Sequence, residues 1–416
     1  TGNDNTAVGY NALTANTTGQ VNTAVGHQAL ATNTTGNANS AVGEDALRNN
    51  TTADGNTAVG RYSLGENTTG EYNTVVGSYA GDANTTGNYN AVLGAGAFGL
   101  NQSGSQDVAI GFEALKVNLA SYNTAIGYQS LVANTTGEKN TAVGGDSLKT
   151  ATTATKNTGI GYEALEATTT GSYNTSVGSN SLKVNTTGAS NTAVGQGALA
   201  QNTTADYNVA IGVDAMNANT TGTKNIAVGS LALDANTTGD KLTAIGYAAL
   251  GANTTADSNT AVGYQAAFGN TTGNTNTAIG YETLYTNTQG DRNTAIGHQA
   301  LYTMNPSGNA DSYNTGVGFY ALYANTTGYR NTALGGLALD ANTTANDNTA
   351  VGYLSLSANT TGANNTAIGV EALEANTTAD NNTAVGYQSL TANTTGAQNT
   401  AVGRLALTSL TTGDYN

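Results

Sequence analysis

The chain has 416 residues, a formal net charge of −15, no cysteine and no tryptophan, and only 9% of its residues are charged. So acidic a chain is not expected to bind nucleic acid, which needs clustered lysine and arginine side chains. The lack of cysteine excludes disulfides and thiolate metal sites. No apolar run approaches the length of a membrane span.

A 17-residue repeat organises the sequence from end to end. The glycine that closes each Ala-Val-Gly or Ala-Ile-Gly triplet recurs in 24 units, from Gly9 to Gly403, with the consensus Asn-Thr-Ala-Val-Gly-Tyr-x-Ala-Leu-x-Ala-Asn-Thr-Thr-Gly-x-x. Two spacings break the period: Gly111 to Gly127 is one residue short, and Gly297 to Gly318 is four residues long. Short units that contact only their neighbours are typical of a solenoid.

Each unit is predicted to contain two short strands and a turn. The first strand, residues 6–9, is apolar or small on both faces and is expected to be buried on both sides. The second, residues 11–15, alternates so that Leu13 and Ala15 point the same way. The Asn-Thr-Thr-Gly turn follows, and Gly19 is expected to take a positive φ.

A helical interpretation fails on length. Glycine or the Asn-Thr-Thr turn interrupts nearly every candidate helix within about nine residues, which is too short for a stable helix, and helical solenoid units need roughly 30 residues. The sequence therefore predicts an all-β fold: a parallel β-solenoid, or β-roll, of about 24 left-handed coils. At ~4.8 Å per coil the rod would be about 115 Å long.

The repeat array is expected to be one continuous domain over residues 1–416, excerpted from a longer fibre protein. Proline cannot donate to a ladder, so the only proline, Pro306, is expected in a part of a coil that departs from the pattern. We predict that the insertion, residues 304–312, loops outward without breaking the stack. Charged residues fall in variable columns, because like charges in one ladder repel. These columns are expected to face solvent; they include Glu44, Asp45, Arg61, Glu71 and Lys116.

Few residues suggest chemistry. His27 and His298 each replace the tyrosine that follows the repeat glycine, and we interpret both as ordinary substitutions rather than metal ligands or bases. The pair Glu44 and Asp45 could bind calcium, but it does not recur in a ladder. Asn16 and its equivalents are formal glycosylation acceptors that turn geometry also explains. No nucleophile set can be assembled and no coil departs from the pattern to form a cleft, so we predict no enzyme activity, catalytic residue, cofactor or metal.

The valine and tyrosine columns are the candidate oligomer-packing residues. A strand with two apolar faces needs a second partner beyond its own coil, and a narrow coil has no room for a tyrosine ring. We therefore expect packing between subunits, with a glycan-binding stripe as the alternative role for the tyrosines. The candidates are Val8, Val25, Val42, Val59, Tyr10, Tyr247, Tyr264 and Tyr281.

The motif Asn-Thr-Ala-Val-Gly-Tyr, at residues 5–10 and again at 259–264, resembles the head repeats of YadA-type trimeric autotransporter adhesins. Similar arrays occur in phage tail-fibre-like proteins and in large bacterial surface proteins. The resemblance covers essentially the whole chain and implies a parallel β-roll, assembled as a homo-oligomer at a cell or virion surface. The unit here is 17 residues, whereas the YadA-type head repeat is nearer 14.

The expected function is structural and adhesive: a rigid extracellular rod that mediates attachment. A homotrimer is the expected assembly, and rings with another number of subunits are the alternative. A phage tail-fibre shaft for host recognition is an alternative function with the same architecture. Ice-binding and polysaccharide-binding or polysaccharide-cleaving solenoids are further alternatives. The ice-binding interpretation is disfavoured because the strand threonine shares a face with valine.

Overall fold

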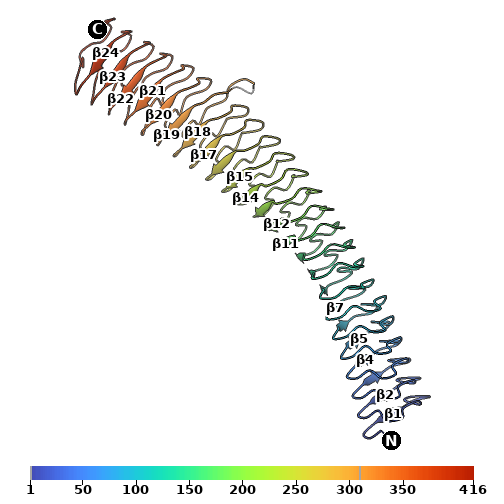
Figure 1. Ribbon diagram of the computed structural model, residues 1–416. Helices are drawn as coiled ribbons and strands as arrows, with labels where there is room; N and C mark the ends of the chain where they lie inside the picture. The colour runs from blue at the N-terminus through green and yellow to red at the C-terminus, as the bar shows by residue number, and fades with distance from the viewer. Residues whose placement is uncertain (1, 309–310) are drawn as a thin grey trace. The chain divides into compact units, whose positions relative to one another are not determined.

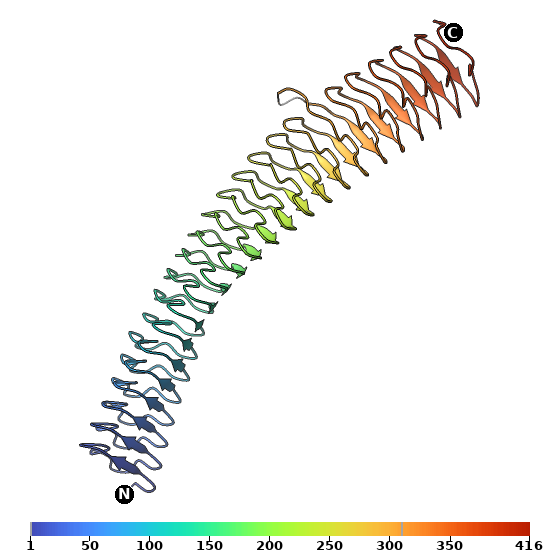
Figure 2. The ribbon, with the colours of Figure 1, turned by 180° about the vertical axis from the view of Figure 1, so that it is seen from behind.

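The computed structural model describes residues 2–308 and 311–416, and that part of the chain consists of strands and turns with no helix. It therefore contains no helix that could cross a membrane. The chain divides into two compact units, residues 1–207 and 208–416. Figure 1 shows the strands of each unit as successive rungs, and Figure 2 shows the same rungs from behind.

Each unit has twelve three-residue strands. Those of the first unit are β1 (Thr6–Val8), β2 (Thr23–Val25), β3 (Ser40–Val42), β4 (Thr57–Val59), β5 (Thr74–Val76), β6 (Ala91–Leu93), β7 (Val108–Ile110), β8 (Thr124–Ile126), β9 (Thr141–Val143), β10 (Thr158–Ile160), β11 (Thr175–Val177) and β12 (Thr192–Val194). Those of the second unit are β13 (Val209–Ile211), β14 (Ile226–Val228), β15 (Thr243–Ile245), β16 (Thr260–Val262), β17 (Thr277–Ile279), β18 (Thr294–Ile296), β19 (Thr315–Val317), β20 (Thr332–Leu334), β21 (Thr349–Val351), β22 (Thr366–Ile368), β23 (Thr383–Val385) and β24 (Thr400–Val402).

Neighbouring strands within each unit pair in parallel, one repeat apart. Ala24 of β2 faces Ala41 of β3, for example. The two irregular spacings do not disturb the strand pairing. β7 and β8 pair across the short repeat, and β18 and β19 pair across the long one. The predicted parallel β-solenoid with 17 residues per coil is thus confirmed.

The core of a coil is narrow and partly polar. In the second coil the fully buried side chains are Ala24, Ala29 and Leu30, together with the amides of Asn22 and Asn33. Identical columns repeat in nearly every coil, so the core is a stack of alanine, leucine and asparagine ladders. With so little apolar volume per coil, the asparagine amides must be fully hydrogen-bonded for the core to be stable.

Two asparagine ladders meet that requirement. We call the column before each strand the strand ladder and the column that opens each Asn-Thr-Thr turn the turn ladder. In the strand ladder, Asn39 Nδ2 donates to Asn22 Oδ1 in the preceding coil at 3.2 Å. In the turn ladder, Asn50 Nδ2 donates to Asn33 Oδ1 at 2.9 Å. Both donors also reach the buried carbonyl of Ala53, at 2.8 and 3.1 Å, so the turn is fastened to both ladders.

The prediction of a second strand, at residues 11–15 and their equivalents in each coil, is wrong. These residues form a turn in which Gln28 and Leu30 have φ of 56° and 51°. The Leu30 N–H donates to Ala46 O in the next coil, whereas the Gln28 N–H donates to Tyr10 O in the previous one. Neighbouring strand residues point to opposite faces, but here Ala29 and Leu30 are both buried. A left-handed conformation costs about 1–2 kcal/mol for a residue with a side chain, and the inter-coil hydrogen bonds and leucine burial offset it.

The glycine with positive φ is also not the predicted one. Gly19 is not among the positive-φ residues, whereas the strand-closing Gly26 has φ of 140°. A Cβ at Gly26 would lie only 2.4 Å from the carbonyl oxygen of Gly43 in the next coil, so no other residue fits there. The turn position accepts alanine, as at Ala53, which is 1% exposed.

The insertion predicted at residues 304–312 includes residues 309–310, which lie outside the described residues. Met304 takes the place of a turn-ladder asparagine, and its sulfur accepts a hydrogen bond from Asn325 Nδ2 at 3.3 Å. The described residues of the insertion are buried at Met304, Pro306 and Ser312 and exposed at Asn305, Ser307, Gly308 and Asp311. The outward course of the whole insertion stays a prediction.

Candidate functional site

The outer face of the strands is a candidate interaction surface in each unit. In β3 only the middle residue, Ala41, is buried, while Ser40 is half-buried and Val42 is 40% exposed. The prediction that this strand is buried on both sides is therefore wrong for a single chain. The pleat turns the middle residue inward and both neighbours outward, so most coils add one threonine or serine and one valine-like side chain to the outer face.

The predicted valine residues form one continuous column. Parallel pairing places Val8 beside Val25, Val25 beside Val42 and Val42 beside Val59. Val59 is 37% exposed and Val8, on the first strand, is 57% exposed. This valine column continues with isoleucine or leucine in many later coils, so it is an apolar stripe rather than a set of isolated side chains.

The predicted tyrosines of the second unit form an aromatic ladder in the column two residues after that stripe. Ring centroids are 5.5 Å apart between Tyr247 and Tyr264 and 5.3 Å apart between Tyr264 and Tyr281, with nearly parallel planes. His298 and Phe319 extend the stack at 5.1 and 5.4 Å. Because the ring faces cover one another along the ladder, solvent meets mainly ring edges and hydroxyl groups. Tyr10 belongs to the first unit, and among the described residues its one stacking partner is His27.

A second aromatic ladder escaped the sequence interpretation. It contains Phe268, Tyr285, Tyr302 and Tyr323, with successive centroids 5.2–5.5 Å apart. Tyr320 links it to the first ladder, since its ring lies 4.8 Å from Tyr323 and 4.1 Å from Phe319. The 17-residue or near-17-residue spacing of these residues could have predicted this ladder from the sequence. Together the two ladders form an aromatic surface on residues 247–323.

The first unit has a notch, contrary to the prediction that no coil forms a cleft. Small residues at Ala95, Gly96 and Gly99 leave a hollow of about 330 Å³ that the rings of Tyr79 and Phe112 also line. Each ring belongs to a stacked pair, Tyr79 with Tyr62 and Phe112 with Tyr128, and the two pairs lie in adjacent columns, because Tyr79 is the second residue after its repeat glycine and Phe112 the first.

Charged groups also line this notch. Burial raises the pKa of Asp82 above its usual value. A hydrogen bond from the Lys116 ammonium, at 2.6 Å, lowers the pKa of Glu113. The hollow therefore combines apolar walls with a carboxylate and an ammonium group at its rim.

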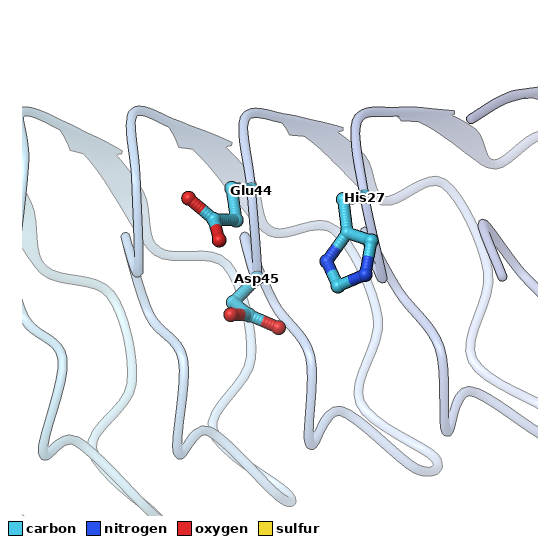
Figure 3. A group of neighbouring side chains, drawn as sticks. All are labelled: His27, Glu44 and Asp45. Atoms are coloured by element: carbon cyan, nitrogen blue, oxygen red, sulfur yellow. The ribbon is translucent and has the colours of Figure 1, made fainter. Parts of the chain in front are cut away.

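One group of three potential metal-ligating side chains occurs in the part of the chain that the structure describes. His27, Glu44 and Asp45 each offer one ligand atom, and these atoms lie within 4.8 Å of one another. Figure 3 shows His27 and Glu44 extending from neighbouring coils on either side of the Asp45 carboxyl group. His27 and Glu44 are one repeat apart, so coil stacking brings together residues that the sequence interpretation treated separately.

Asp45 is buried, at 4% exposure, although the charged residues of the variable columns were predicted to face solvent. Two neighbouring side chains account for this burial. The Arg48 guanidinium lies 3.9 Å from Asp45 Oδ1, and a hydrogen bond to the Asp45 carboxylate raises the pKa of the Tyr62 phenol. Even so, Asp45 Oδ1 has no hydrogen-bond partner.

No protein-family model matches this chain, and no curated protein matches it either.

Proposed function

We propose that this chain is a segment of an extracellular adhesive fibre that assembles side by side with copies of itself and presents an attachment surface on a cell or virion. The observation that carries the proposal is the contrast between the two sides of each strand. The inner side is closed within one chain by alanine, leucine and asparagine ladders. The outer side leaves the valine column exposed or half-buried, and the tyrosine column that follows the strands is exposed at Tyr247, Tyr264 and Tyr281.

A second copy of the chain is the partner that this surface fits best. Large contiguous apolar patches on soluble proteins usually mark interaction sites. A copy carries the same stripe at the same 17-residue spacing, so apolar columns would meet in register, and closed symmetric rings are the common form of self-association. The resemblance to YadA-type heads suggests a trimer.

The test is to place charge in the valine column. The triple variant Val25→Asp, Val42→Asp and Val59→Asp is expected to remain folded, because these side chains lie outside the core, but to run as a monomer in light scattering. The matched control is Thr18→Asp, Thr35→Asp and Thr52→Asp, which adds the same charge at exposed turn positions of adjacent coils and should leave the assembly intact. A native chain that is monomeric at every concentration would defeat the proposal.

Glycan binding is a second candidate function, supported by the notch that Tyr79 and Phe112 line. Aromatic ring faces and nearby carboxylates are a combination suited to the apolar face and hydroxyl groups of a sugar ring. A sugar ring in the hollow would meet both aromatic side chains that line it.

The change Ala95→Phe places a protein ring in this hollow, in the same repeat column as Phe112. It is expected to abolish retention on immobilised glycans without changing the mass of the assembly. Unchanged retention, or none by the native chain, would remove this candidate while leaving self-assembly untouched.

A further inference from the structure

We propose that His27, Glu44 and Asp45 form a binding site for a divalent transition-metal ion, with Zn²⁺ as the representative cation. The site has two independent supports. One is the convergence of an imidazole and two carboxylates from two coils within 4.8 Å. The other is Asp45 Oδ1, a carboxylate oxygen of a buried residue that has no hydrogen-bond donor.

The donor set selects the class of metal. Zinc sites are built from histidine nitrogen and carboxylate oxygen at about 2.0–2.2 Å, and imidazole suits zinc and its neighbours in the first transition row. Calcium prefers six to eight oxygen ligands, which this site does not supply. Three protein ligands leave a position for water or an external ligand.

The geometry requires only small movements. Two ligands of a tetrahedral zinc ion lie about 3.4 Å apart at these bond lengths, so the present separations of at most 4.8 Å must close by up to about 1.4 Å. His27 and Glu44 are exposed and can change rotamer. Asp45 is buried and its N–H donates to His27 O at 2.9 Å, so it is the least mobile of the three ligands.

Two arginines border the site, and each has another partner. Arg48 Nη2 lies 2.8 Å from Glu66 Oε1, a closer contact than its 3.9 Å approach to Asp45. Arg61 Nε lies 3.2 Å from Glu44 Oε2, but its guanidinium also lies over the rings of Tyr62 and Tyr79. Metal binding would replace the Arg61–Glu44 contact and leave the guanidinium on those rings.

The chain offers its own control. His298 occupies the same repeat column as His27 but stacks between Tyr281 and Phe319, and no acidic residue takes the place of Glu44 and Asp45 in the next coil, where Phe319 and Tyr320 stand. A property of the column alone would affect both histidines, whereas a metal site affects only His27.

The experiment titrates the 416-residue chain with ZnCl₂ while the imidazole ¹⁵N signals of its two histidines are recorded by NMR. We expect the His27 signals to shift to saturation at one equivalent and the His298 signals to stay in place. Calorimetry should show a loss of at least tenfold in affinity for Asp45→Asn and for His27→Ala, and no change for His298→Ala. Circular dichroism of each variant checks that the fold is retained.

Three outcomes would overturn the proposal. They are equal shifts of both histidines, no shift of either, and unchanged affinity in Asp45→Asn and His27→Ala. The same His27 shift with CaCl₂ would contradict the assignment to a transition metal.

Discussion

The turn ladder is regular in one region of the molecule and interrupted in another. Between residues 219 and 287, each asparagine amide donates to the asparagine of the preceding coil at 2.9–3.3 Å. Between residues 101 and 185 the ladder passes through the short repeat and then through Ala151 and Thr168, which replace asparagine.

The interrupted region contains buried polar atoms without hydrogen-bond partners, and the regular region contains none. Three such atoms lie in the interrupted turn ladder: Asn101 Nδ2, Asn134 Oδ1 and Thr168 Oγ1. Asn134 Oδ1 lacks a donor because Ala151 stands where the next amide would be. A substitution in one coil thus leaves an unpaired group in its neighbour, as expected of a structure whose units contact only adjacent units. The ladders, rather than the individual coils, are the unit of stability.

The largest effect is expected at Asp107, which replaces asparagine in the strand ladder of the interrupted region. Burial raises the pKa of Asp107 to about 8, whereas the unfolded value is near 3.9. The folded state therefore binds a proton that the unfolded state releases, and stability falls as pH rises from about 4 to about 8.

Asp107→Asn should remove this part of the pH dependence. A shift of about four pKa units corresponds to at most about 5 kcal/mol, so the variant should be more stable than the native chain by several kcal/mol at pH 9. The difference should vanish at pH 4, which is the internal control. Urea unfolding at both pH values measures it, and equal stability at pH 9 would contradict the account.

Breaking the regular ladder should have the next largest effect. Asn236→Ala removes the donor to Asn219 Oδ1 and the acceptor of Asn253 Nδ2. Unpaired buried groups cost about 1–3 kcal/mol each, so we expect a loss of about 2–4 kcal/mol in urea unfolding. Thr255→Ala, at an exposed position nearby, should change stability by less than about 0.5 kcal/mol. Similar effects from the two variants would show that the ladder is not a source of stability.

Completing the interrupted ladder should have a smaller, stabilising effect. The double variant Ala151→Asn and Thr168→Asn supplies the donor that Asn134 Oδ1 lacks and continues the column to Asn185. We expect a gain of about 1–2 kcal/mol, seen as slower amide hydrogen exchange in residues 134–185 and unchanged exchange in residues 219–287. Faster exchange in residues 134–185 would mean that these coils have no room for the amides.

The sequence predicted the coil number, the strand positions and their register, because one pattern repeated 24 times leaves only one way to stack identical columns. It did not predict the turn that replaces the second strand. The alternation around Leu13 suits a strand, whereas the positive φ at each core leucine is set by hydrogen bonds to other coils. Asp45 was predicted to lie on the surface because its burial depends on Tyr62, which comes from the next coil, and on the way the turn folds Arg48 back toward it.

The spacing of His27 and Glu44 was readable from the sequence, since residues one repeat apart become neighbours. This spacing pointed to a metal site only once the burial of Asp45 and its unpaired oxygen were known. The second aromatic ladder, at Tyr285 and Tyr302, was likewise readable from spacing alone.

The central claim is that the outer strand face associates with copies of the chain while the core is complete within one chain. Hydroxyl-radical footprinting at rising protein concentration tests it most directly, because the method reads the exposure of individual side chains. We predict that Val42, Val59, Tyr264 and Tyr281 become protected as the chain assembles, whereas Tyr72 and Tyr89, which precede the strands and are exposed, keep the same oxidation rate. If the oxidation rate of each of the six residues stayed the same at every protein concentration, the claim would be contradicted.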